Sequence, residues 1–238
     1  MTDQSELERY QGALVDWFSS KVSPEHLKGL ASYNNDDYEL IDTVFRRFTE
    51  LTDCVDRLDL CIGFIKAPMP RRKGVKADDY LMYHITFYLQ EVYVLEERFR
   101  AYAKSVLRLR KRRVGLREGE SKAVEEMLTF IRDALSNVAL TRGEHVHTRA
   151  FRDEEMRELS MFAFLSTHNA DNPEWKPIAK QLYRISQSRW VEQITDSREA
   201  VTKILNVYSE LMYKLVFDGS PSLLPNNSFK PTPLRGAA

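Results

Sequence analysis

Residues 80–106 have the sequence YLMYHITFYLQEVYVLEERFRAYAKSV, and this stretch decides how the chain folds. Apolar and aromatic side chains recur in it every three or four residues, at Tyr80, His84, Tyr88, Val92, Leu95, Phe99, Tyr102 and Val106. That spacing puts them on one face of an α-helix, which has 3.6 residues per turn. We therefore predict one long amphipathic helix, with His84 as a hydrogen-bonded core histidine rather than a catalytic one.

The same spacing recurs on both sides of this stretch. It predicts helices over residues 4–19, from about 36 to the stop at Pro68, over 121–138, over 153–164, and over 178–216 with a possible interruption near residue 196. The two-residue alternation expected of strands is absent. The sequence therefore predicts an all-α fold, an antiparallel bundle of long helices.

The chain divides by pattern into three segments. Residues 1–35 are expected to form an N-terminal helix and a connection that pack on the bundle, and residues 36–218 the bundle itself. Residues 219–238 contain four of the nine prolines and almost no periodicity. We expect them to form a disordered C-terminal tail.

Composition excludes little and points to no particular partner. Lys+Arg and Asp+Glu balance at 35 each, so net charge is uninformative. Neither a basic-then-apolar signal segment nor a run of about 18 apolar residues is present, which predicts a cytoplasmic protein without a membrane partner. Cys54 and Cys61 lie seven residues apart in one predicted helix, roughly 10 Å along its axis, which is too far for a mutual disulfide.

The stretch that combines groups for chemistry is Thr141–Arg149. It holds two of the five histidines of the chain, His145 and His147, together with Arg142 and Glu144. An imidazole transfers protons near neutral pH, and a guanidinium offers paired donors to a phosphate. A catalytic site of this sequence is therefore expected here.

The pattern Arg142-x4-His147 resembles the Arg-x4–6-His motif of the HEPN superfamily, all-α domains of prokaryotic defence systems and toxin–antitoxin pairs. The resemblance implies a metal-independent endoribonuclease that acts on RNA as a homodimer, with an antitoxin protein as a possible partner. It assigns phosphate stabilisation to Arg142 and acid/base catalysis to His147, with Glu144 and His145 in support. No metal and no cofactor are expected.

Three features keep alternatives open at this site. Helical spacing alone pairs Arg142 with His145 rather than with His147, unless Gly143 relaxes the helix locally. Gly143 also stands where the family commonly has a polar residue, which favours a non-catalytic helical module that binds RNA or protein. A metal site at His145-x-His147 is a minor alternative, because its spacing of two is not the three or four that helical metal pairs need.

A basic run ends the predicted helix that follows residue 77. Its cationic residues are Arg108, Arg110, Lys111, Arg112 and Arg113. They are candidates for binding an RNA backbone. An equally weighted interpretation is a solvated helix end whose cations complement the helix dipole.

Overall fold

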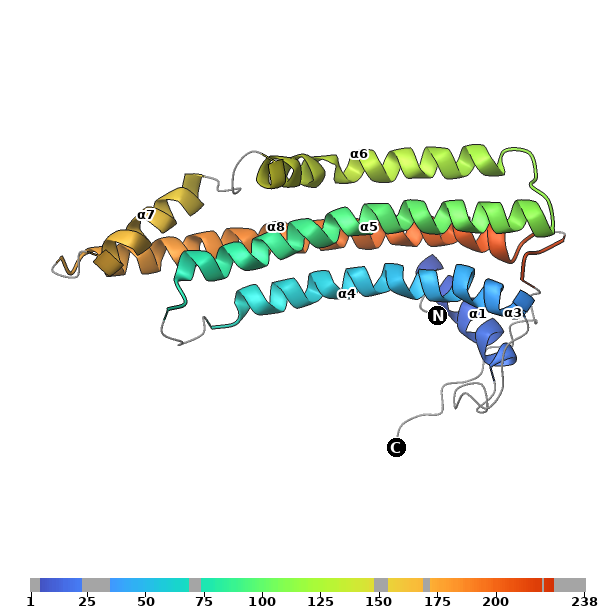
Figure 1. The fold of residues 1–238 in the computed structure, drawn as a ribbon, viewed down its shortest axis with the longest axis horizontal. Coiled ribbons are helices and arrows are strands. Elements are labelled where there is room, and N and C mark those ends of the chain that lie inside the picture. Colours follow the sequence, from blue (N-terminus) through green and yellow to red (C-terminus); the bar gives the residue numbers. More distant parts are fainter. Residues whose placement is uncertain are drawn as a thin grey trace, which may run out of the picture. The chain divides into compact units, whose positions relative to one another are not determined.

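The computed structural model describes residues 5–22, 35–68, 74–147, 154–168, 172–219 and 221–224, with the side chains of residues 35 and 137–147 excepted. Its helices are α1 (Glu6–Lys21), α3 (Asn35–Leu40), the π-helical η1 (Ile41–Arg46), α4 (Arg47–Lys66), α5 (Ala77–Arg113), α6 (Glu120–His147), α7 (Glu154–His168) and α8 (Trp175–Val216) (Figure 1). The described part of the chain contains no strand. The predicted all-α class is confirmed.

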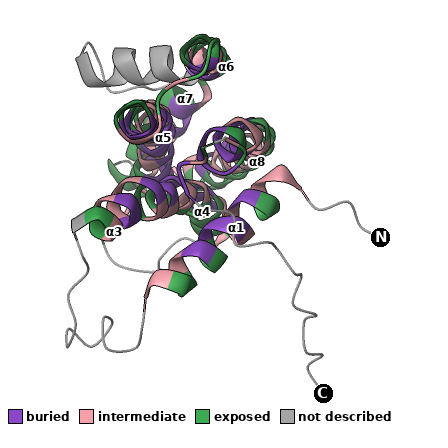
Figure 2. Ribbon diagram, turned by 90° about the vertical axis from the view of Figure 1, so that its right-hand side faces the viewer, coloured by how far each residue is buried: buried purple, intermediate pink, exposed green. Residues whose placement is uncertain are grey.

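Hydrogen bonds between Ser5 and Glu8 cap the N-terminus of helix α1. The Ser5 hydroxyl accepts from the Glu8 amide at 3.2 Å, and the Glu8 carboxylate accepts from the Ser5 amide at 3.0 Å, a capping box. Along the helix, buried and exposed residues alternate with its turns (Figure 2). Its buried side chains Tyr10, Ala13, Leu14 and Trp17 recur at steps of three and four, as an amphipathic helix requires.

Four helices differ from the sequence prediction. Two of them continue past their predicted ends, α6 to His147 instead of residue 138 and α7 to His168 instead of residue 164. The helix predicted from about residue 36 contains the π-helical segment η1, a wider coil that apolar spacing does not announce. Helix α8 runs from Trp175 to Val216 without the interruption predicted near residue 196. The connection predicted around residues 23–34 lies outside the described residues.

Contacts divide the chain into two compact units, which the prediction of a single bundle did not separate. Unit 1 comprises Met1–Glu50, Phe99–Thr129 and Lys203–Ala238, and unit 2 comprises Leu51–Arg98 and Phe130–Thr202. Each unit therefore draws on helices that are distant in sequence.

Unit 1 is organised around buried aromatic rings. The hydroxyls of Tyr10 and Tyr102 share a hydrogen bond, and the Tyr208 hydroxyl donates to the carbonyl of Phe99 at 2.9 Å. Tyr10 also packs edge-on against Phe48, with ring centroids 4.8 Å apart. Because every one of these hydroxyls has a partner, the rings are buried without leaving a donor unsatisfied.

The packed part of unit 1 extends past the boundary predicted at residue 219. Leu223 and Leu224 are buried, and the Leu224 amide donates to the carbonyl of Val216 at 3.0 Å. The first residues after α8 therefore return to the core. The rest of the predicted tail, residues 225–238, lies outside the described residues.

In unit 2, α4 runs antiparallel to α5 and to α8. Arg57 of α4 donates to Glu91 of α5, and the carbonyl of Phe64, farther along α4, accepts from Tyr80, which lies earlier in α5. Residue numbers therefore fall along α5 as they rise along α4. In the same way, Asp59 of α4 accepts from Arg198 of α8, and the carbonyl of Ile65, farther along α4, accepts from Gln187, which lies earlier in α8. It follows that α5 and α8 run parallel to each other, so the bundle is antiparallel only between some of its helices.

Candidate functional site

The predicted catalytic stretch lies at the end of α6. The helix continues through Gly143 to His147, so Arg142, Glu144, His145 and His147 all have helical backbone. Their side chains lie outside the described residues. The local relaxation at Gly143 that would bring Arg142 and His147 together is not seen in the backbone.

Helical geometry then sets how these four positions are grouped. On a continuous helix, positions five apart diverge by roughly 140°, whereas positions three apart share a face. Arg142 therefore shares a face with His145, and Glu144 shares another with His147. Within a single copy of the chain, the helix does not group Arg142 with His147.

Most side chains of the basic run at the end of α5 form ion pairs or hydrogen bonds within the chain. Arg113 bonds Asp36 at 3.2 Å and Glu39 at 2.9 Å, and Arg112 also pairs with Glu39. Hydrogen bonds from Arg113 and then Arg112 lower the pKa of the Glu39 carboxyl. These two arginines hold α5 against α3.

Arg110 differs from the rest of the run because it is buried, with 1 % of its surface exposed. Its Nε donates to Glu120 at 2.9 Å, and its Nη1 donates to the carbonyl of Leu215 at 2.9 Å. Burial raises the pKa of Glu120, but hydrogen bonds from Arg110 and Arg117 outweigh that effect, and the net pKa is lowered. Arg110 thus joins three helices of unit 1, and its guanidinium is not presented at the surface.

The two remaining cations of the run are exposed. Arg108 donates to the carbonyl of Lys104 at 3.2 Å and to the Ser105 hydroxyl at 3.3 Å, both on its own helix. Lys111 is exposed and has no ion pair among the described residues. Of the five predicted RNA-binding residues, these two leave most of their charge open to solvent.

His84 lies in the core of unit 2, as its position on the apolar stripe predicts. It is 8 % exposed, and its ring stacks on Phe64 with centroids 5.6 Å apart and meets Tyr80 edge-on at 4.6 Å. Burial lowers its pKa, which favours the neutral imidazole. Its Nε2 is buried without a hydrogen-bond partner, so this nitrogen does not supply the hydrogen bond predicted for His84.

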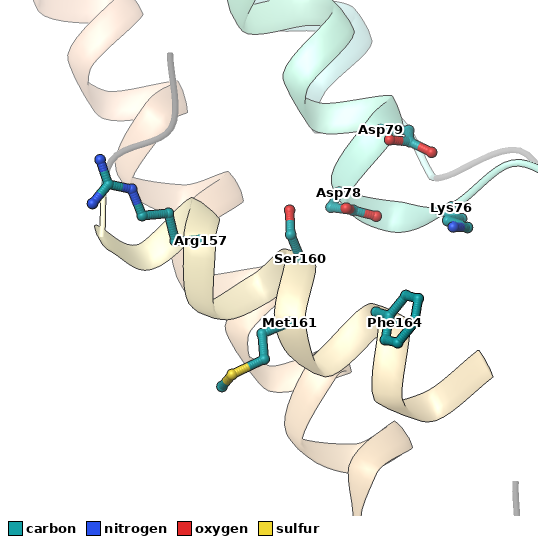
Figure 3. Close-up of a pocket in the computed structure, with 7 residues that line it drawn as sticks. All are labelled: Lys76, Asp78, Asp79, Arg157, Ser160, Met161 and Phe164. Atoms are coloured by element: carbon teal, nitrogen blue, oxygen red, sulfur yellow. The ribbon is translucent and has the colours of Figure 1, made fainter. Parts of the chain in front are cut away.

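A pocket of about 420 Å³ in unit 2 brings together side chains that the sequence analysis did not single out (Figure 3). Asp78 and Asp79 lie in the first turn of α5, and Ser160 projects toward them from α7, while Arg157 extends away. Asp78 is only 7 % exposed, and its Oδ1, like the Ser160 Oγ, is buried without a partner. Buried polar atoms without a partner are costly, so these two groups are the polar atoms of this site that a bound hydrogen-bonding group would satisfy.

A second pocket in unit 2, of about 960 Å³, lies among the end of α4, the chain before α5, α7 and α8. Its cationic residues on α8 are Lys176, Lys180 and Arg184. The spacing of four between these cations can be read from the sequence. The sequence does not predict that the other three segments pack near them and complete the pocket.

The described helices include none long and apolar enough to cross a membrane. Comparison with known proteins found no matching family model, no matching curated protein and no matching solved structure.

Proposed function

We propose that the chain is a metal-independent endoribonuclease of HEPN type, cytoplasmic, and active in a bacterial defence or toxin–antitoxin setting. The observation that carries the proposal is the placement of Arg142 and His147 in the last turns of a long helix of an all-α chain. This is the context in which the resembling family carries its motif.

The proposed site is completed by two copies of the chain. Because Arg142 and His147 lie on different faces of a continuous α6, a homodimer in which two α6 ends meet supplies what one helix does not. Each phosphodiester then contacts Arg142 of one copy and His147 of the other. His145, which shares a face with Arg142, is the second choice for the acid/base.

The chemistry follows from the two side chains. A neutral imidazole accepts the proton of a ribose 2′-hydroxyl, and an imidazolium gives a proton to the departing 5′-oxygen; an unperturbed pKa of about 6.5 suits both steps. The Arg142 guanidinium stabilises the charge that grows on the phosphate. Arg108 and Lys111, the exposed cations of α5, are proposed to contact the RNA backbone.

The test is cleavage of a fluorescent RNA in the presence of a chelator. His147→Ala and Arg142→Ala are expected to lower the rate at least 100-fold, while His168→Ala, an exposed histidine of α7, is the matched control. Equal rates for the wild type and His147→Ala would remove the assignment. A loss confined to His145→Ala would transfer the acid/base role to that residue.

One observation favours a second candidate, a non-catalytic helical module that binds RNA or protein. The backbone of α6 passes through Gly143 without a break, and Gly143 replaces the polar residue common in the family. Toxicity on expression separates the two functions. A nuclease is toxic only with both Arg142 and His147 intact, and an antitoxin partner would relieve that toxicity, whereas a binding module is indifferent to these residues.

A further inference from the structure

The larger pocket of unit 2 has the size of a small-molecule site. Its volume of about 960 Å³ lies at the upper end of the range of roughly 300–1,000 Å³ that such sites occupy. Small apolar side chains form much of the wall, one from each of its four segments: Ala67, Val75, Ala163 and Ala179. A wall of this kind is best covered by an aliphatic group.

The charges around the pocket have one sign. Five cations line it, and none of the described lining residues is aspartate or glutamate. The cations are Lys66, Lys76, Lys176, Lys180 and Arg184. None of the five has an ion pair with a carboxylate in the part of the chain that the structure describes.

Three of these cations lie at positions where their charge destabilises the helix unless an anion is bound nearby. Lys176, Lys180 and Arg184 follow one another at intervals of four on α8, and like charges at that interval destabilise a helix. Lys176 also lies in the first turn, which contains no acidic residue, and the positive end of the helix dipole repels cations there. A bound anion would relieve both repulsions.

One residue that lines the pocket also carries a hydrogen-bond donor without a partner. The Tyr183 hydroxyl is buried and has no partner, although its residue lines the pocket one position before Arg184. Gln187, farther along α8, already donates to the carbonyl of Ile65 at 2.5 Å. The phenol of Tyr183 therefore remains to bind an acceptor.

We propose that this pocket binds an amphiphile with one anionic head group, a carboxylate or a phosphate monoester on an aliphatic chain. The head group lies against the α8 cations and accepts from Tyr183, while the chain covers the alanine-rich wall. An inorganic anion would leave that wall uncovered, and a neutral alcohol would leave the cations unpaired. This site is independent of the proposed ribonuclease motif on α6.

The experiment is isothermal titration of the full chain with decanoate and, separately, with decyl phosphate, below their micellar concentrations. We expect 1:1 binding of at least one of them, weakening as salt is added, with inorganic phosphate and 1-decanol at least tenfold weaker. The preferred head group distinguishes a fatty acid from a phosphate monoester. Absence of binding by both amphiphiles overturns the proposal, and so does binding of inorganic phosphate with equal affinity.

Charge reversal locates the site. Lys180→Glu is expected to weaken amphiphile binding at least tenfold, and Arg184→Glu provides a second variant. Lys203→Glu is the matched control, an exposed lysine of the same helix outside the pocket, and should bind as the wild type does. Thermal unfolding by circular dichroism establishes that each variant is folded. Unchanged affinity in both folded pocket variants refutes the assignment.

Discussion

Replacing Arg110 by Met tests whether the ion pair with Glu120 stabilises unit 1. The two side chains are 2 % and 10 % exposed, so the substitution removes the buried partner of the carboxylate and leaves it with the half-exposed Arg117 alone. It also removes the donor to the carbonyl of Leu215. Removing one member of a buried ion pair costs about 3–5 kcal/mol. The control is Arg113→Met, whose ion pairs with Asp36 and Glu39 are more exposed and should contribute less than about 1 kcal/mol.

The assay is thermal and urea unfolding followed by far-UV circular dichroism. Each kcal/mol shifts the midpoint of a domain of this size by about 2–4 °C, so Arg110→Met should lower it by about 6–20 °C and Arg113→Met by at most about 4 °C. The double variant Arg110→Met/Glu120→Met should regain part of the loss, because no buried charge is left unpaired. Equal shifts for the two single variants would refute the reasoning.

The same pair predicts an acid dependence of stability. The pKa of Glu120 in the folded protein is lowered from its ordinary value of 4.5, with Arg110 and Arg117 as the cause. The stabilisation is therefore fully present above pH 4.5 and is lost as the pH falls through the lower folded pKa. The wild type should lose stability in that window more steeply than Glu120→Gln. Parallel curves would contradict the role of the carboxylate.

Three further predictions concern other parts of the molecule. Gly219→Ala should destabilise by about 1–3 kcal/mol in urea unfolding, because its Cβ would lie 2.7 Å from the carbonyl oxygen of the residue two positions on. Gly63→Ala, in the last turn of α4 with nothing within 4 Å of its Cβ, should be neutral or stabilise by up to about 1 kcal/mol. Burial raises the pKa of Tyr10 and of Tyr102, so the stabilisation from these two neutral phenols is complete below pH 10 and should be lost as the pH rises above it. Urea unfolding below and above pH 10 measures this loss in the wild type and in Tyr10→Phe, and an equally steep loss in the variant would contradict the role of Tyr10. Burial also raises the pKa of Cys61 to about 12, so this thiol should resist Ellman's reagent at pH 8 until urea is added, and prompt labelling would show that it is accessible.

Sequence periodicity determined the class of fold and the approximate place of the predicted helices. Steps of three and four identify a helix because one turn contains 3.6 residues, and that rule acts within a single segment. The buried residues Tyr88, Leu95 and Phe99 are among those that it placed in the core. The π-helical turn at Ile41–Arg46 was not predicted, since it leaves no distinct apolar spacing.

Tertiary structure decided which charged side chains are free. Five cations near the end of α5 look alike in the sequence, yet Arg110 is buried against Glu120 and Leu215, while Lys111 is exposed. The same holds for the larger pocket of unit 2, whose cations come from α4, α8 and the chain before α5. The sequence determines the face of each helix on which a charge lies, because that depends on the helical repeat alone. Which segments approach that face depends on contacts between residues tens of positions apart, and these have no period along the chain.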